Sequence, residues 1–125
     1  MSTSFQLQNN ALKELPHNIE AEQGILGAIL LNNEIFYDIS ETINVEHFYE
    51  PVHKLIFDVI GKMISKGQIA TPITLKSFFE VEKNLEEIGG SNYLVRLANS
   101  AVSLDYAKNY AHIIYNLAVR RGLYE

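Results

Sequence analysis

The sequence predicts a single all-α domain of about six helices joined by short loops. Apolar residues recur at helical spacing along the chain, most clearly between Val52 and Ile64. No segment combines sustained alternation of apolar and polar residues with hairpin turn signals, so strands are not predicted. The chain has 125 residues, of which 47% are hydrophobic and none is cysteine. A chain of this length can bury a core without disulfides.

The first predicted helix follows a polar N-terminal segment. Residues 1–14 carry only isolated apolar side chains, so we expect a flexible tail. Asn18 is suited to cap a helix, and Glu20 and Glu22 lie in its first turn, where the helix dipole favours negative charge. We therefore interpret both glutamates as solvated surface charges or as charges that interact with the helix dipole.

Two glycines interrupt this helix, although each lowers helix propensity by about 1 kcal/mol relative to alanine. Gly24 and Gly27 lie three residues apart and Ala28 follows, so these small residues share one side of the helix. Small side chains allow another backbone to approach closely. The spacing therefore predicts a helix-packing role for Gly24, Gly27 and Ala28 rather than a ligand site.

Two further helices are predicted between residues 35 and 66. The apolar residues of the shorter one have helical spacing and are Ile35, Phe36, Ile39 and Ile43. Pro51 is placed to be the first residue of the longer helix. Gly67 is placed to end it with a positive φ. The repeat of apolar residues between these two positions is the strongest amphipathic pattern in the chain.

Hydroxyl residues mark the starts of the last three predicted helices. Thr71 or Thr74 could cap the first of them, Ser91 the second and Ser103 the third. Each side-chain oxygen would accept a hydrogen bond from a backbone N–H that the first helical turn leaves without a partner.

The last predicted helix is apolar on more than one side. Tyr110, Ile114 and Leu117 define an inward face, whereas Ile113 and Tyr115 fall outside it. A helix of this kind is buried on more than one side, so we expect contact with another subunit or another protein. A central position within the fold is the alternative. The candidate residues for an interface with another subunit or another protein are Tyr93, Tyr106, Tyr110, Ile113, Ile114, Tyr115, Leu117 and Tyr124.

No pattern of residues predicts a catalytic, metal or nucleotide site. The G-x-x-x-x-G-K-[ST] phosphate loop is absent, and the four histidines form no H-x-x-x-H pair with a third ligand. We expect a structural role for His53. The acid pairs Glu46–Glu50 and Glu86–Glu87 are interpreted as solvated. A net charge of −5 with scattered basic residues argues against tight binding to a phosphate backbone.

Five blocks of the sequence resemble, in order, the N-terminal domain of the bacterial replicative DNA helicases of the DnaB family. The opening block is PHNIEAEQGILGAILLN, and it is followed by FYEPVHKLIFDVI, KGQIATPITL, LEEIGGSNYLVRLANS and YAHIIYNLAVRRGL. Thr71 and Pro72 depart from the pattern, because the family usually has an aspartate in this region, before its Thr-Leu pair. Thr71 can still cap a turn there.

The resemblance implies that residues 15–125 form a helical collar domain whose C-terminal helix is the first arm of a helical hairpin. In that family the domain dimerises through the hairpin, and three dimers form a collar above a ring of six ATPase domains. The collar contacts primase and, in some bacteria, the helicase loader. The parent protein is an ATP-dependent hydrolase of the primosome that encircles single-stranded DNA and unwinds duplex DNA 5′ to 3′.

By the same resemblance, the second hairpin helix, the linker and the ATPase domain would lie beyond Glu125. This chain would then have no catalytic activity and no cofactor, with ATP and Mg²⁺ bound by the ATPase domain of the parent protein.

Two other interpretations remain open at the level of sequence. The chain could be a free-standing helical adaptor, such as the helicase-binding domain of a primase. It could also be a small enzyme or a direct DNA binder, although its net charge and lack of a catalytic cluster argue against both. No signal-peptide pattern and no apolar run of about 20 residues is present. We therefore expect a soluble cytoplasmic protein that reaches the nucleoid through the replisome.

Overall fold

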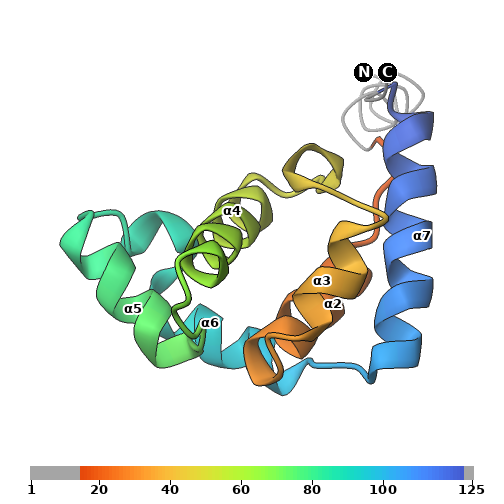
Figure 1. The fold of residues 1–125 in the computed structure, drawn as a ribbon. Helices are drawn as coiled ribbons and strands as arrows, with labels where there is room; N and C mark the ends of the chain where they lie inside the picture. The colour runs from red at the N-terminus through yellow and green to blue at the C-terminus, as the bar shows by residue number, and fades with distance from the viewer. Residues whose placement is uncertain (1–14, 123–125) are drawn as a thin grey trace, which may run out of the picture.

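The computed structural model describes residues 15–122, which form six α-helices, two 3₁₀ helices and no strand (Figure 1). The elements are α2 (Ile19–Leu31), α3 (Ile35–Ser40), η1 (Val45–His47), α4 (Pro51–Ser65), α5 (Pro72–Val81), η2 (Glu86–Ile88), α6 (Gly90–Asn99) and α7 (Leu104–Arg120). The predicted all-α fold is confirmed. The predicted tail, residues 1–14, lies outside the described residues.

Helix α2 lies at the centre of the domain. It packs against α3, α4, α6 and α7, and nine of its 13 residues are buried. Asn18 caps it as predicted, because its side-chain oxygen accepts a hydrogen bond from the Ala21 N–H at 2.9 Å. A helix buried on several sides has a weak amphipathic pattern, which is why the sequence marks α4 more clearly than α2.

The remaining helices lie around α2. Helix α7 runs along one side of the domain, and α5 lies on the opposite side (Figure 1). The last helix is therefore at the edge of the fold. The alternative explanation of its broad apolar character, a central position, does not hold for the described residues.

Four further predicted helix ends are present. Pro51 is the first residue of α4, and Gly67 follows that helix with φ of +77°. Thr71, of the two threonines considered, caps α5 by accepting a hydrogen bond from the Thr74 N–H at 3.1 Å. Ser103 caps α7 through the Tyr106 N–H at 3.5 Å.

Two predicted boundaries are wrong. Ser91 does not cap α6, because the helix already begins at Gly90 and Gly89 occupies the N-cap position with φ of +93°. Residues other than glycine rarely adopt such a φ, so the turn between η2 and α6 depends on the backbone of Gly89. The helix predicted to reach Ile43 ends at Ser40, although Ile43 is still buried in the core.

Candidate functional site

Helix α7 presents apolar side chains to solvent on either side of a narrow buried stripe. The stripe consists of Ala107, Ala111, Ile114 and Ala118. These residues repeat at helical spacing and form one side of α7. Because three of them are alanines, α7 can lie close to α2, and its larger side chains remain outside this contact. The exposed apolar residues are Leu104, Tyr106, Ile113, Tyr115 and Val119, with exposed fractions of 36–60%. Leu104, Tyr115 and Val119 lie on one flank of the stripe, and Tyr106 and Ile113 lie on the other. We call the two flanks together the α7 outer face.

The candidate interface residues do not all reach this face. Tyr106, Ile113 and Tyr115 belong to it, and Tyr110 and Leu117 are half-buried beside it. The assignment of Ile114 to an interface is wrong for the described chain, because its side chain is 1% exposed and belongs to the core.

Two other candidates lie elsewhere. Tyr93 is on α6, where it is half-buried and its ring stacks on His53. Tyr124 lies outside the described residues.

Aromatic contacts hold part of the α7 outer face in place. The Tyr115 ring meets His47 edge-on at a centroid distance of 5.2 Å, and the Tyr106 and Tyr110 rings lie 6.2 Å apart. Rings held by neighbours lose little further conformational freedom when a partner binds, so these tyrosines are suited to an interface.

Gly27 lies where α2 crosses the C-terminal end of α6. A Cβ atom added to Gly27 would be 1.9 Å from the carbonyl oxygen of Leu97, a distance that no side chain could tolerate without movement of the backbone. At Gly24 the neighbouring atoms are different, because an added Cβ would meet the side chains of Val102 and Tyr110 at 3.1 Å and 3.4 Å. Close approach of two backbones therefore depends on Gly27.

Beneath the surface, Glu22 and His53 form a buried polar pair between α2 and α4. Both are at most 1% exposed, and the Glu22 Oε1 atom lies 2.7 Å from His53 Nδ1. The carboxylate also accepts hydrogen bonds from the backbone N–H groups of Tyr49 at 2.7 Å and Glu50 at 3.3 Å. Glu50 is the N-cap of α4 but offers no side-chain cap. Glu22 thus supplies the negative charge that the N-terminus of α4 favours.

The pair continues to α6 through Tyr93. The Tyr93 oxygen lies 2.6 Å from His53 Nε2 and accepts a hydrogen bond from the Gln23 amide at 3.1 Å. One arrangement of protons satisfies every group: neutral His53 donates from Nδ1 to Glu22 and accepts the Tyr93 hydroxyl proton at Nε2. Burial raises the pKa of the Tyr93 hydroxyl, and the nearby Glu50 and Glu22 carboxylates also raise it, against the lowering by the Gln23 hydrogen bond and by Arg96.

The interpretation of Glu22 as a solvated charge is therefore wrong. Glu22 turns into the domain because α4 begins directly opposite it, and only Glu20 of the two is exposed. A carboxylate beside a histidine can activate a nucleophile in enzymes. Here the second histidine nitrogen faces Tyr93, and His53 is 0% exposed, so this arrangement joins α2, α4 and α6.

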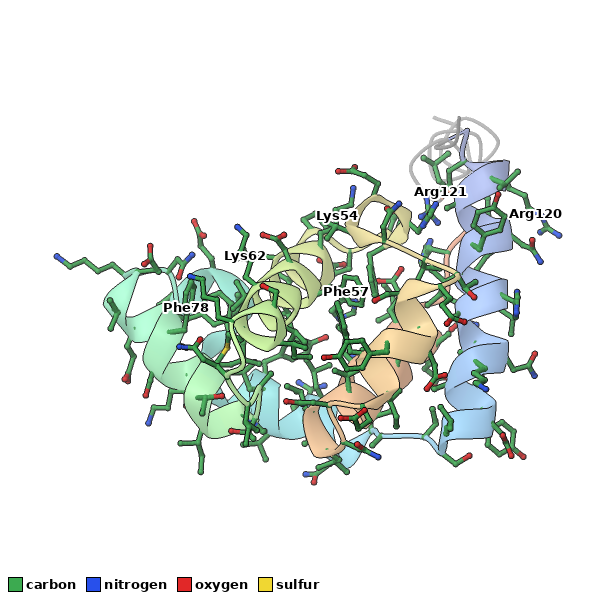
Figure 2. The ribbon with its side chains drawn as sticks, viewed as in Figure 1. Lys54, Phe57, Lys62, Phe78, Arg120 and Arg121 are labelled. Atoms are coloured by element: carbon green, nitrogen blue, oxygen red, sulfur yellow. The ribbon has the colours of Figure 1, made fainter. Side chains whose placement is uncertain are left out.

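A second polar cluster fixes the C-terminal end of α7. Arg121 donates hydrogen bonds to the carbonyl oxygens of Pro16 and His47, both at 2.8 Å, and its guanidinium lies 5.4 Å from the centre of the Tyr49 ring. Arg121 points toward the rest of the domain, whereas Arg120 points away from it (Figure 2). Burial lowers the pKa of the Arg121 guanidinium, partly offset by the Glu22 carboxylate and by Tyr49.

Sequence reasoning missed both clusters, although weak signals were available. The opening block places Glu22 on an otherwise apolar side of α2, and the block with His53 places that histidine on the inward face of α4. Neither position reveals its partner, because the two residues lie 31 positions apart in sequence. The contacts of Arg121 join residues that are even farther apart in sequence. They involve backbone carbonyls, which every residue type has, so the sequence does not mark these partners.

Within residues 15–122, no group of three or more histidine, cysteine or acidic side chains could hold a metal ion. No helix in the same range has both the length and the apolar character needed to cross a membrane.

Comparison with known proteins gives a consistent result. The family model of the "DnaB-like helicase N terminal domain" matches residues 14–116. The chain is 47% identical over 109 residues to the replicative DNA helicase DnaB of Rickettsia typhi, and this match covers 87% of the chain and 22% of that protein. The corresponding helicase of Buchnera aphidicola (subspecies Acyrthosiphon pisum) is 36% identical over 96 residues, with 77% of the chain and 21% of the relative covered.

The fold also matches a solved structure. The crystal structure of the N-terminal domain of DnaB helicase from Mycobacterium tuberculosis superimposes with a TM-score of 0.83 and 30% sequence identity, covering 88% of this chain and 80% of that one. The chain spans about a fifth of the length of the curated relatives, as the 22% coverage shows.

Proposed function

The chain belongs to the family of DnaB-like helicase N-terminal domains, and from this premise we propose that it is a non-catalytic assembly and interaction domain of a hexameric replicative helicase. Its roles are to join subunits into a collar and to bind primase and, in some bacteria, the helicase loader. The parent protein unwinds duplex DNA at the replication fork by hydrolysing nucleoside triphosphates, with ATP and Mg²⁺ held by its ATPase domain.

The α7 outer face carries this proposal. Five large apolar side chains are exposed along one 17-residue helix at the edge of the domain. Large apolar side chains exposed to solvent, with aromatic rings among them, are typical of protein interfaces. The helix is also anchored at its end by Arg121, so its outer face has a fixed orientation in which to meet a partner.

Light scattering across a range of protein concentrations tests the subunit role. We expect the average mass of the wild-type chain to rise with concentration. Tyr115→Glu and Ile113→Glu should weaken this association by about tenfold, because a charge would have to be buried in the contact. Leu31→Glu is the matched control, since Leu31 is 66% exposed and lies on α2.

Thermal unfolding of the same variants separates association from folding. The substituted side chains are exposed, so each variant should unfold near the wild-type temperature at low concentration. Loss of the fold without a change in association would contradict the proposal for the α7 outer face.

Primase binding needs its own measurement. Calorimetric titration with the helicase-binding domain of a primase should give saturable binding, and Tyr106→Ala should weaken it because Tyr106 is the most exposed aromatic residue of α7, at 60%. Absence of binding to the primase from the same organism would argue against this part of the proposal.

The alternative of a free-standing primase adaptor has no specific observation in its favour. The matched relatives are replicative helicases, and the family model is that of the helicase domain.

A further inference from the structure

The buried stripe of α7 does not by itself fix the direction of the helix. The stripe rests on α2, and three of its four residues are alanines. Alanine side chains form only shallow ridges, which interlock little with a neighbouring helix. This contact therefore limits the distance between α7 and α2 more than it limits the angle between them.

The N-terminal end of α7 is held where the chain leaves α6. The Ser103 side chain caps the helix, and the preceding Val102 N–H donates a hydrogen bond to the Gly24 carbonyl oxygen of α2 at 3.4 Å. The Val102 side chain also packs against the core. This end is a fixed point about which the rest of α7 could swing.

Arg121 holds the opposite end of α7. It is the C-cap of the helix, and its two terminal nitrogens bind different segments of the chain. The Nη1 atom donates to the carbonyl oxygen of Pro16, which precedes α2, and the Nη2 atom donates to that of His47 in η1, both at 2.8 Å. A planar fork of donors with two separate acceptors defines both the position and the orientation of the guanidinium.

The segments that receive Arg121 are themselves held by the core. The Tyr49 ring lies 5.4 Å from the guanidinium carbon and stacks on His17 at a centroid distance of 4.1 Å. The backbone N–H of Tyr49 donates to the buried carboxylate of Glu22 on α2. Arg121 therefore ties α7 to a part of the domain that is built on the central helix.

We propose that Arg121 is a positioning residue for subunit association, because it fixes the direction in which α7 presents its outer face. A helix of 17 residues is about 25 Å long, so a swing of about 10° at the N-terminal end moves the other end by about 4 Å. Such a movement would break both hydrogen bonds of Arg121, since they hold only over a narrow range of distances. This inference rests on the proposed function of the α7 outer face.

Arg120 shows what is particular to Arg121. Arg120 is exposed and points away from the domain, whereas Arg121 points toward it (Figure 2). Both place a positive charge at the C-terminal end of α7, where the helix dipole favours it. None of the ion pairs within residues 15–122 uses either arginine. The difference between them is therefore the pair of carbonyl oxygens that Arg121 binds.

Distances between two spin labels test the direction of α7 without any association. Ser77→Cys and Asn116→Cys place the labels on exposed positions of α5 and α7, which lie on opposite sides of the domain (Figure 1), and the chain has no other cysteine. Excess unlabelled chain removes distances between copies.

In this labelled chain, Arg121→Lys should make the distribution of distances about twice as wide. Lysine keeps the charge but replaces the fork of donors with a single ammonium group. Arg120→Lys is the matched control and should leave the width unchanged. Equal widths in the two variants would overturn the proposal.

Light scattering of the unlabelled variants tests the consequence for association. We expect Arg121→Lys to associate about tenfold more weakly than the wild type, and Arg120→Lys to associate as the wild type does. Ile60→Val is the control for stability, since it removes a buried carbon from α4 and leaves Arg121 in place. Equally weak association of Ile60→Val would show that association follows stability alone, which would overturn the positioning role.

The inference and the proposed function fail in different ways. A wild-type chain that does not associate at any concentration would contradict the proposed subunit role of the α7 outer face, while the label distances would still decide whether Arg121 sets the direction of α7. Equal association of the wild type and Arg121→Lys would leave the α7 outer face its role and would overturn the inference about Arg121.

Discussion

At the scale of single residues, three groups within residues 49–53 surround the buried carboxylate of Glu22. Its oxygens accept hydrogen bonds from two backbone N–H groups at the start of α4 and from the His53 ring. A buried charge is stable only when its partners remain, so removing one member of this set should destabilise the fold more than removing a surface charge.

Glu22→Gln should lower the free energy of unfolding by about 1–3 kcal/mol, because the amide NH₂ group would face a hydrogen-bond donor. Chemical denaturation monitored by circular dichroism measures the change. Glu20→Gln is the control, since Glu20 lies two residues earlier on the exposed side of the same helix. Equal stability of the two variants would show that the buried carboxylate contributes nothing specific.

The Tyr93 hydroxyl gives the fold a dependence on alkaline pH. Its pKa in the folded state is raised above the ordinary 10.0, mainly by burial. The unfolded state therefore loses this proton first. The contribution of Tyr93 to stability is fully present well below pH 10 and is lost as the pH rises through the folded-state pKa.

Stability should fall between pH 9 and pH 11, about one unit on either side of the ordinary pKa, and Tyr93→Phe should remove the part of this fall that comes from the Tyr93 hydroxyl. Urea unfolding at each pH compares it with Tyr37→Phe, whose hydroxyl is on a side chain that is 56% exposed. An identical pH dependence for wild type and Tyr93→Phe would refute the assignment.

At the scale of helices, the crossing of α2 and α6 depends on the absence of one side chain. The backbone of α6 lies against Gly27, whereas Gly24 faces side chains that can move. Gly24 also accepts a hydrogen bond through its carbonyl oxygen from the Val102 N–H at 3.4 Å. The two glycines look equivalent in sequence, but only Gly27 allows the backbones of two helices to approach closely.

Gly27→Ala should destabilise the domain by about 3 kcal/mol, because the new methyl group overlaps the Leu97 carbonyl and the two helices must separate. Gly24→Ala should change stability by less than about 1 kcal/mol, since the gain in helix propensity offsets a tighter contact with Val102. Thermal and urea unfolding of both variants test the contrast. If Gly27→Ala were as stable as wild type, the helices could not cross as closely as the structure indicates.

At the scale of the whole molecule, the domain has a single core, and α7 exposes apolar side chains on both of its flanks. Its net charge is −5, and its basic residues are distributed over several helices. A protein of this kind repels a phosphate backbone more than it attracts one, so we do not expect this chain to bind DNA tightly.

We expect the isolated chain to bind single-stranded DNA only weakly, with a dissociation constant above about 100 μM at physiological salt. It should also show no ATP turnover. Fluorescence anisotropy with a labelled oligonucleotide and a phosphate-release assay measure these properties. Submicromolar, salt-sensitive binding or measurable hydrolysis would contradict the assignment of a non-catalytic module.

Helix positions were predictable because they depend on local chemistry. Asn18, Thr71 and Ser103 cap helices with their own side chains, and Pro51 starts a helix through its fixed φ. The start of α6 was not predictable in this way, because Gly89 makes that turn with its backbone alone.

The candidate site was predictable only in part. Tyr106, Ile113 and Tyr115 do lie on the surface of α7, but Ile114, next to two of them in sequence, is buried. One residue on a helix corresponds to about 100° of rotation, so small differences in how α7 rests on α2 decide which neighbour faces solvent.

The fold class and the family of this protein could be inferred from the chain alone, because helical periodicity, capping residues and ordered motif blocks are properties of the chain read along its length. The roles of Glu22, Gly27 and Arg121 became visible only in the folded molecule. Each of them acts on a segment far away in sequence, and partners brought together by packing leave no local pattern. The same holds for the α7 outer face, since exposure depends on what the rest of the domain covers.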